Sequence, residues 1–418
     1  MGIVRTFAIA ILAVSVITFV AFFGRLPVFR NTPIGFLHRV VWIHVPRICG
    51  SLDSYLTGGR LSRTGTYLLY EKHYVVTFFF LGLLTGSVAL FLPPTWPFIS
   101  IFQKCLVFLL VPLPYIFTYL CQISGPNSPH IITAKTNHSH LLHYPFDHVL
   151  YHPDNLCRTC AIPKPARSKH CSICKACVAR SDHHCVWVNN CVGRGNYKYF
   201  LGLLFFTSLL LFYGSYLAVS TLRPQVRDHF ERYPWWHSSE YESHGTLTNR
   251  FMAIWEYWID ILGTAFMVGG ISRGGVGMLS TLTAPLPLGL LVYHIYLIWA
   301  GMTTNETSKW SDVREDMNDG EVFIADLKHS SIDSASASIS SMDVVDDYRS
   351  EASFESEWPQ RSRQFLIRTH DGQPPKNVRP QIADLVVQDS WRRTWHLGDV
   401  ENIYDLGFWG NVMEALVN

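Results

Sequence analysis

The sequence has few charged residues for its length. Only 16% of its 418 residues are Asp, Glu, Lys or Arg, against roughly 25% in an ordinary soluble domain, so little polar material is present to coat a soluble surface. An excess of one sign is also missing, because 34 basic and 32 acidic residues give a net charge of +2. Nucleic acid is therefore excluded as the main partner, since binding its phosphates needs a large basic excess.

Cysteine is scarce outside one short segment. Of the ten cysteines, Cys49, Cys105 and Cys121 stand alone, and the other seven lie between Cys157 and Cys191. A concentration of this kind calls for a local chemical explanation.

What the chain does have is long uncharged runs. A helix needs roughly 20 residues to cross about 30 Å of hydrocarbon, and five runs qualify: residues 7–23, 74–92, 105–123, 199–222 and 276–302. One such run could be a buried core helix, but five predict an α-helical integral membrane protein with about five transmembrane helices, the first a signal anchor. Residues 251–272 are also apolar, but Glu256 and Asp260 interrupt them, so we expect that segment to be interfacial.

Five spans place alternate connections on opposite sides of the membrane. Residues 24–73, 124–198 and 303–418 then share one side, and residues 93–104 and 223–275 share the other. Lys and Arg number seven and nine in the first two segments, against one and five opposite, so the positive-inside rule makes the first side cytosolic. Thiolate metal ligands need a reducing compartment, which also places the cysteine-rich segment in the cytosol and the N-terminus in the lumen. We therefore expect a multi-pass protein of the endoplasmic reticulum with a cytosolic active site.

The cysteine-rich segment has the spacing of a metal-binding domain. It reads Cys157-x2-Cys160-x9-His170-Cys171-x2-Cys174-x2-Cys177-x4-Asp182-His183-His184-Cys185-x5-Cys191. A two-residue gap lets both sulfurs reach one tetrahedral zinc ion at about 2.3 Å. A cytosolic location disfavours disulfides, and the histidines favour zinc over an iron–sulfur cluster. Two closed zinc sites need eight ligands, whereas seven cysteines and three histidines are present, so two groups are left over.

Alternation along an extended strand suggests a candidate pair. His183 and Cys185 would point to one face and His184 to the other. His184 could then bind zinc while His183 takes the proton of the Cys185 thiol, and Asp182 could hold the useful tautomer of the imidazole. The spacing alone leaves open a second interpretation, in which Cys185 is a further metal ligand without chemistry.

The position of Cys185 in the chain favours the catalytic interpretation. Thirteen residues separate it from the predicted span that begins at Tyr199, so the thiol must lie near the bilayer surface. A nucleophilic thiol there suits a reaction between an aqueous cofactor and a lipid chain, and protein S-acylation is the natural candidate.

At residues 157–200 the sequence resembles the cysteine-rich domain of the DHHC family of protein S-acyltransferases. The likeness continues through Cys185-Val186-Trp187-Val188-Asn189-Asn190-Cys191-Val192-Gly193, although Val186 stands where most of the family has proline. Thr303-Thr304-Asn305-Glu306 resembles the family's TTxE motif, and residues 402–411 resemble its C-terminal motif, with Val412 in place of the usual tryptophan. The family's DPG motif is reduced to Ser124-Gly125-Pro126. Residues 164–171 and the extra N-terminal span are most similar to the fungal branch that acylates cysteines beside transmembrane helices, SNAREs included.

The resemblance implies two structural zinc ions in interleaved sites. One site would use Cys157, Cys160, His170 and Cys177, and the other Cys171, Cys174, His184 and Cys191. Cys185 and His183, the pair chosen by alternation, stay free. The implied reaction is ping-pong: Cys185, activated by His183 and Asp182, takes the acyl group of palmitoyl-CoA and passes it to a cysteine of a membrane protein.

The resemblance also implies roles for residues outside the zinc ligands. Thr303, Thr304, Glu306 and Asn411 would be structural. The phosphates of CoA need cations, and the basic residues near the thiol are Arg167, Lys169, Arg180, Arg194 and Lys198. Each of these could instead face solvent or lipid headgroups.

The segment after the last span divides into two motifs and a linker. Residues 329–356 are rich in serine, aspartate and glutamate, a composition typical of a disordered linker, so residues 399–418 must fold back to the membrane core.

Two other functions stay open: a membrane-anchored zinc module that only recruits partners, and a RING-type ubiquitin ligase, which the short, regular ligand gaps disfavour. The predicted segments are a signal anchor at 1–23, cytosolic residues 24–73, spans within 74–123, the cysteine-rich segment 124–198 with its zinc-binding part at 157–198, spans and a lumenal loop within 199–302, and a cytosolic tail at 303–418.

Overall fold

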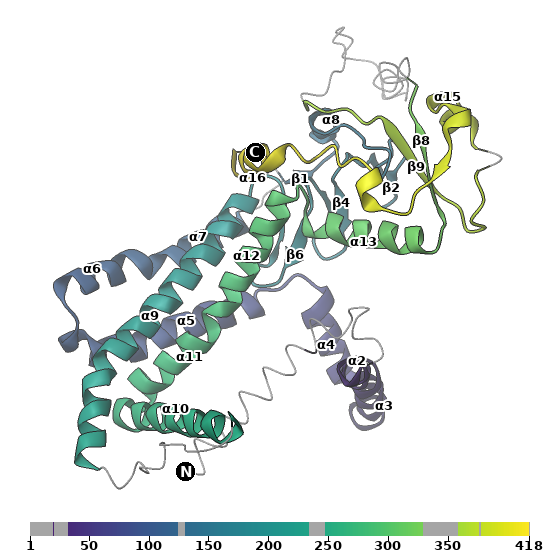
Figure 1. The fold of residues 1–418 in the computed structure, drawn as a ribbon. Coiled ribbons are helices and arrows are strands. Elements are labelled where there is room, and N and C mark those ends of the chain that lie inside the picture. The colour runs from purple at the N-terminus through teal and green to yellow at the C-terminus, as the bar shows by residue number, and fades with distance from the viewer. Residues whose placement is uncertain are drawn as a thin grey trace. The chain divides into compact units, whose positions relative to one another are not determined.

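The computed structural model describes residues 20, 32–123, 130–233, 247–328, 358–375 and 378–417. Within them, four helical runs are long and apolar enough to cross a membrane: Val75–Phe98, Ile101–Gln122, Tyr197–Arg232 and Tyr257–Trp299. They contain four of the five predicted spans, which confirms a mostly helical, multi-pass membrane protein (Figure 1). The predicted first span, residues 7–23, lies outside the described residues except for Val20, as do residues 124–126 and the linker at 329–356.

The chain forms two compact units. The first comprises Met1–Val75, Gly82–Lys104 and Tyr213–Leu282. Its described elements are, in chain order, α2 (Pro33–Arg39), the π-helical turn η2 (Val40–His44), α3 (Val45–Thr57), α4 (Arg60–Tyr70), most of α5 (Val75–Thr95), η3 (Trp96–Phe98), the end of α9 (Tyr197–Arg232), α10 (Leu247–Gly270), the turn η6 (Ile271–Gly275) and α11 (Val276–Thr283).

Helix α10 covers most of the segment that we predict to be interfacial. It ends at Gly270, whose φ of 62° interrupts the helix before α11 begins. A side chain at Gly274 would come within 2.7 Å of the Ala265 carbonyl oxygen, so η6 can fold back closely on α10 only with glycine there. Figure 1 shows α10 and α11 running in different directions. The two are therefore separate helices, and the interfacial position of α10 stays a prediction.

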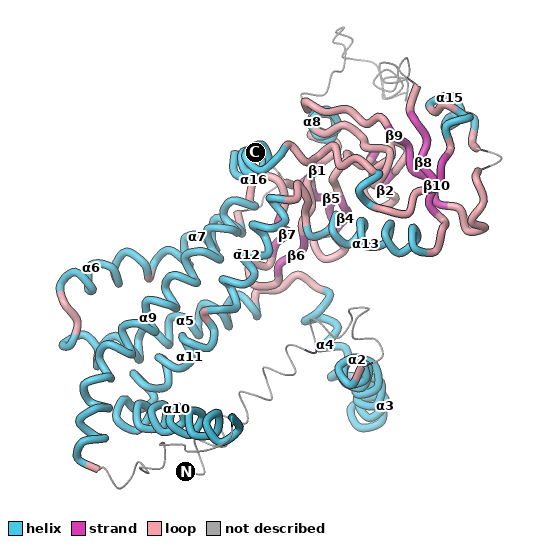
Figure 2. The backbone as a smooth tube through the Cα atoms, viewed as in Figure 1, coloured by secondary structure: helices cyan, strands magenta, loops and turns pink. Residues whose placement is uncertain are grey.

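The second unit comprises Val76–Leu81, Cys105–Phe212 and Thr283–Asn418, and it contains every described strand (magenta in Figure 2). Its apolar helices are most of α6 (Ile101–Leu110), α7 (Pro112–Gln122), the start of α9 and α12 (Pro285–Trp299). Outside the apolar runs lie α8 (Asn137–His143), α13 (Thr304–Asn318), α15 (Pro380–Leu385), η8 (Gln388–Ser390), η9 (Leu397–Asp399) and α16 (Gly407–Val417).

The cysteine-rich part of this unit consists of very short antiparallel strands. A three-stranded sheet has the order β1 (Ile131–Ile132), β5 (Ala176–Val178), β4 (Lys169–Cys171), and two hairpins pair β2 (Leu156–Cys157) with β3 (Ile162–Pro163) and β6 (His183–Cys185) with β7 (Asn190–Val192). Strands of two or three residues bury too little surface to be stable alone. Bound metal is the usual way to hold such a domain together.

A second sheet lies in the segment that the sequence presents only as a tail. Strands β8 (Val322–Asp326), β9 (Gln364–Arg368) and β10 (Arg392–Arg393) are antiparallel in the order β10-β8-β9. Its buried residues Val322, Ile324 and Leu366 pack with Trp310 and Val313 of α13. The C-terminal segment thus folds onto the helix that carries the TTxE motif.

Candidate active site and zinc-binding clusters

The cysteines and histidines gather in the two sets that the resemblance implies. In the first set, the Nδ1 atom of His170 lies 3.5, 3.3 and 3.9 Å from the sulfurs of Cys157, Cys160 and Cys177. In the second, His184 Nδ1 lies 3.8, 3.4 and 3.6 Å from the sulfurs of Cys171, Cys174 and Cys191. A tetrahedral zinc ion with bonds of about 2.0–2.3 Å requires ligand atoms roughly 3.3–3.8 Å apart. Both sets therefore fit zinc.

Strand pairing explains how distant ligands meet. His170 on β4 is paired with Cys177 on β5, and His184 on β6 is paired with Cys191 on β7. In each C-x2-C pair the second cysteine donates its backbone N–H to the first sulfur at 3.4 Å, as Cys160 does to Cys157 and Cys174 to Cys171. In each set, the hairpin register thus supplies one histidine and one cysteine, and the local turn supplies the other two cysteines.

The two groups left over by the ligand sets lie side by side at the end of β6. His183 and Cys185 are two residues apart on β6, so their side chains share one face of the strand, and His183 Nδ1 lies 2.6 Å from Asp182 Oδ1. The backbone N–H of Thr304 donates to the other carboxylate oxygen of Asp182 at 3.0 Å. As the alternation argument predicts, His184 belongs to a metal-type set, whereas His183 lies outside both four-residue sets and beside Asp182; the catalytic roles stay a prediction.

Burial and pairing set the charges of this group. Burial raises the pKa of Asp182, but the hydrogen bond and charge of His183 outweigh it and bring the pKa to about 2. Burial lowers the pKa of His183, but hydrogen bonds to Asp182 and Cys185 raise it to about 10. The imidazole is thus basic enough to hold the proton of a neighbouring thiol at neutral pH.

A second histidine, His294 on α12, faces the same group. Its side chain is buried, its Nδ1 atom lies 3.0 Å from the Tyr197 hydroxyl, and its ring centroid is 5.9 Å from that of His183. One of its ring nitrogens is within 4.8 Å of ligand-type atoms of both Asp182 and His183. Sequence reasoning missed this residue, although an ionisable residue inside a predicted span is a signal of function.

The thiol side of the group is apolar. Cys185 is 6% exposed and belongs to a buried cluster with residues of α7, α9, α12 and α16. Members from these helices are Cys121, Phe200, Leu291, Ile298 and Ala415. The thiol therefore lies where the polar side chains of His183 and Asp182 meet the apolar helices.

The TTxE motif forms the start of α13. Thr303 and Glu306 make a capping box, in which the Glu306 N–H donates to Thr303 Oγ1 at 3.2 Å and the Thr303 N–H donates to Glu306 Oε2 at 2.9 Å. The next residue, Thr304, holds Asp182 through its backbone. The motif thus caps α13 and also holds the carboxylate of Asp182.

Arg167 and Arg180 are buried in ion pairs, which corrects our expectation that they contact CoA phosphates. Arg167 binds Glu306 through two hydrogen bonds of 2.8 Å, and Arg180 Nε lies 2.6 Å from a carboxylate oxygen of Glu414 on α16. Arg167 also lies 3.7 Å from Glu414. Both guanidinium groups are turned away from solvent, so they join the cysteine-rich domain to α13 and α16. Sequence reasoning missed Glu414.

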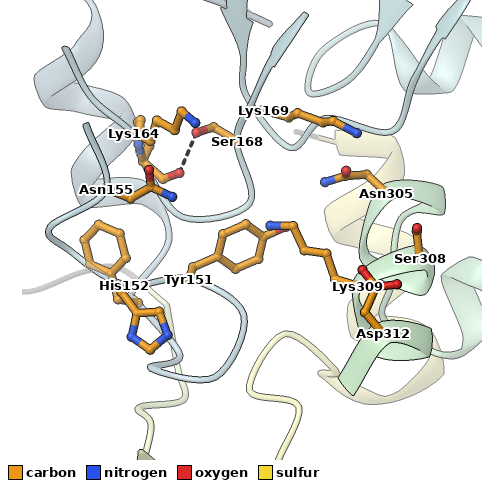
Figure 3. Close-up of a pocket in the computed structure, with 12 residues that line it drawn as sticks. Tyr151, His152, Asn155, Lys164, Ser168, Lys169, Asn305, Ser308, Lys309 and Asp312 are labelled. Atoms are coloured by element: carbon orange, nitrogen blue, oxygen red, sulfur yellow. Dashed lines mark hydrogen bonds between the residues drawn. The ribbon is translucent and has the colours of Figure 1, made fainter. Parts of the chain in front are cut away.

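The other basic residues expected near CoA remain accessible. Lys169 is exposed, and Lys198 and Arg194 are half-buried. Lys169 lines a cavity of about 320 Å³ together with Lys164 of the same loop and Lys309 of α13 (Figure 3). Burial lowers the pKa of Lys309 to about 8 against the opposing charges of Glu306 and Asp147. Three lysines at one cavity favour an anionic ligand; sequence reasoning missed Lys309, which lies far from Lys169 in the chain.

The C-terminal motif lies against the end of α12. The Asn411 side chain accepts the Leu406 N–H at 2.8 Å and donates to Asp405 Oδ1 at 2.8 Å and to the Trp299 carbonyl at 3.4 Å. Asn402 donates to the Ala300 carbonyl at 3.4 Å. The expected return of residues 399–418 to the core is therefore observed within the described part of the chain.

Fold and site together define a multi-pass membrane protein in which two zinc-type clusters hold a cysteine, histidine and aspartate group beside apolar helices. The sequence model of the DHHC palmitoyltransferase family matches residues 150–311. The palmitoyltransferase SWF1 of Neurospora crassa is 39% identical over 425 residues, covering 100% of this chain and 93% of that protein. Its namesake in Emericella nidulans is 40% identical over 435 residues, covering 100% and 98%, and the palmitoyltransferase ZDHHC4 of Bos taurus is 39% identical over 144 residues, covering 33% and 41%.

The chain belongs to the DHHC palmitoyltransferase family and is a protein S-palmitoyltransferase. Its two Cys/His clusters are the zinc sites expected of that family's domain.

Proposed function

We propose that the protein transfers palmitate from palmitoyl-CoA to cysteines of membrane proteins through an acyl-enzyme on Cys185. The observation that carries this proposal is the division of the cluster: the two zinc-type sets use eight residues and leave out Cys185 and His183, which lie on one face of β6, with His183 paired to Asp182. A thiol beside a base becomes an activated nucleophile when a carboxylate orients that base.

Each half of the reaction moves one proton and one acyl group. In the first, the proton of Cys185 passes to His183, the sulfur attacks the thioester carbonyl, the bond to the CoA sulfur breaks, and His183 returns the proton to the leaving CoA thiol. In the second, His183 takes the proton of the substrate thiol, whose sulfur attacks the acyl-enzyme, and Cys185 leaves and regains the proton. Asp182 stabilises the imidazolium in both halves.

The zinc ions would supply no open coordination position, since four protein ligands fill each site. Cys171, Cys174, Cys191 and His184 instead fix β6 and β7, the hairpin that carries Cys185. Their role is to hold the thiol, the imidazole and the carboxylate in place.

The lysine cavity is our proposed contact for the CoA phosphates. Lys164 and Lys169 flank the cysteine-rich loop, and Lys309 lies with its Nζ atom 3.7 Å from the centroid of the Tyr151 ring (Figure 3). Lys198, at the start of α9, is a further cation close to Cys185 in the chain. The fatty chain would extend from Cys185 among the apolar helices, where each buried methylene contributes about 0.8 kcal/mol.

We further propose that the active site is cytosolic, that the protein resides in the endoplasmic reticulum, and that it acts on cysteines next to transmembrane helices, as in SNAREs. The basic excess of residues 24–73 and 124–198 supports the orientation, and the proximity of Cys185 to α9 supports a substrate cysteine at the membrane surface.

The test is acyl transfer by the purified protein. Wild type should form a hydroxylamine-sensitive adduct with palmitoyl-CoA and pass it to a cysteine peptide; Cys185→Ser should form none, and His183→Ala should slow both steps by about 10²–10⁴-fold. Cys105→Ser, a change of an exposed cysteine outside the cluster, is the matched control and should behave as wild type. An adduct that persists in Cys185→Ser would refute the assignment and leave a zinc-binding recruitment module as the better function.

A further inference from the structure

The described residues before α5 form a helical hairpin that the palmitoyltransferase activity does not use. Helices α2 and α3 join through η2 into one helical stretch, and α4 follows after Gly58 and Gly59, whose φ values of 66° and 80° suit glycine. Asp53 is buried at the turn, where its carboxylate accepts the Ser62 N–H at 2.7 Å and also bonds the Thr57 hydroxyl. We refer to α3 and α4 with this turn as the N-terminal hairpin.

One side of α3 is apolar and exposed. Its large apolar residues follow the helical spacing of i, i+3, i+7, i+10 and i+11, which places them on one face: Val45, Ile48, Leu52, Tyr55 and Leu56. Ile48 is 65% exposed, Tyr55 87% and Leu56 67%. Arg47 and Ser54 lie on the opposite face. An apolar stripe this exposed would be costly in water.

The exposed charge of the described segment before α5 is predominantly basic. Within residues 32–73 the acidic residues are Asp53, which is buried, and Glu71. Five basic residues are exposed in the same stretch: Arg39, Arg47, Arg60, Arg63 and Lys72. An amphipathic helix with a basic polar side is the usual form of a segment that lies on an anionic membrane surface.

The chain itself brings the hairpin to a membrane. Helix α4 ends at Tyr70 and the apolar helix α5 begins at Val75, so at most about 17 Å of extended chain separates them. The ring of His73 stacks on Tyr67 of α4 with centroids 5.5 Å apart, which ties the connection to the hairpin. The hairpin is not among the four apolar runs able to span a bilayer.

We propose that the N-terminal hairpin lies on the bilayer surface, with the α3 stripe inserted at the boundary of headgroups and acyl chains and the basic residues among anionic headgroups. Lipid is favoured over a protein partner because the tether to α5 keeps the stripe at the membrane and because the exposed charge complements anionic lipid. This surface is independent of the acyl-transfer reaction and would anchor the segment that enters α5.

The test compares thiol reactivity on the two faces of α3 in the full-length protein, one copy per nanodisc. Native Cys49 is exposed in the structure and lies on the apolar side; the Cys49→Ser/Ser54→Cys double variant moves the thiol to the exposed polar side. Reaction with a hydrophilic maleimide is read peptide by peptide by mass spectrometry. In nanodiscs of phosphatidylcholine with phosphatidylserine, we expect position 49 to react about tenfold more slowly than position 54, because the apolar face is immersed.

Varying the lipid composition distinguishes a lipid surface from another part of the protein as the partner of the α3 stripe. The protection of position 49 should weaken in phosphatidylcholine alone, and in Arg47→Ser/Arg60→Ser, which keeps the stripe but removes two headgroup contacts. Equal rates at positions 49 and 54 would overturn the proposal. Protection of position 49 that is unchanged in a lipid-free amphipathic polymer would also overturn it, because another part of the protein would then cover the stripe.

Discussion

At the scale of residues, Arg167 shows what buried charge does in this protein. Its side chain and that of Glu306 are each 1% exposed and are joined by two parallel hydrogen bonds. Desolvating both ions is costly, but removing one partner leaves the other charge buried and alone. We expect Arg167→Ala to lower the free energy of unfolding by about 3–5 kcal/mol, measured by unfolding in mild detergent.

The matched variant is Arg167→Lys, which keeps the charge but cannot form the two-pronged contact. Its free energy of unfolding should lie between those of wild type and Arg167→Ala. An unfolding midpoint for Arg167→Ala equal to that of wild type would show that the pair does not stabilise the fold.

Asp147 gives a pH prediction. Burial raises its pKa from about 3.8 to about 6, although three backbone N–H groups partly oppose the shift. Because the folded state binds this proton more tightly than the unfolded chain, ionised Asp147 costs stability above pH 6, and the cost disappears as the pH falls toward 4. When the pH is lowered from 7 to 5, the free energy of unfolding of the wild type should rise by about 1 kcal/mol relative to that of Asp147→Asn.

The comparison with Asp147→Asn cancels the effect of acid on the zinc ligands, which is common to both proteins. Parallel stability curves for the two proteins over this pH range would contradict the assignment.

At the scale of elements, Asn411 is one of the side chains that hold α16 in place. Asn411 both accepts and donates, linking the turn at Asp405 and Leu406 to the Trp299 carbonyl of α12. We expect Asn411→Ala to lower the free energy of unfolding by about 1–3 kcal/mol, because buried backbone groups lose their partners. It should also make residues 399–417 more accessible to limited proteolysis. Asn411→Gln keeps both the acceptor and the donor and should release α16 less; cleavage of Asn411→Ala at the wild-type rate would argue against this role.

At the scale of the whole molecule, the zinc clusters are expected to carry the fold of the cysteine-rich domain. Its strands are two or three residues long, so metal binding must supply much of their stability. Purified protein should contain about two zinc ions per chain, Cys157→Ala should lose zinc, and Cys185→Ser should retain both. Removal of zinc by a chelator should abolish acylation together with the domain's protease resistance.

Zinc content separates the two interpretations of Cys185. If Cys185→Ser loses a zinc ion, the thiol is a ligand and the eight-residue division is wrong. If the chelated protein keeps its protease resistance, the short strands are stable without metal.

Much of the site was predictable because its parts are close in sequence. C-x2-C spacing forces two sulfurs to one ion, and strand alternation separates His183 from His184 within three residues. The buried network was not predictable, because Glu306 and Glu414 meet Arg167 and Arg180 across 139 to 247 residues, and a charged residue in a sequence looks the same whether buried or solvated. The sheet of β8, β9 and β10 was missed for a similar reason, since its strands are separated by a long serine-rich segment.

The sequence by itself determined the membrane class and the segment that holds the cysteines and histidines, because hydrophobic run length and short spacings act locally; the division of these residues into two ligand sets and a thiol came from the family resemblance. Only the tertiary structure decided which charges are buried, that His294 and Thr304 face the catalytic pair, and that Lys309 joins Lys169 at one cavity. These depend on how α12, α13 and α16 pack on the cysteine-rich domain, and such packing brings together residues whose separation along the chain carries no local signal.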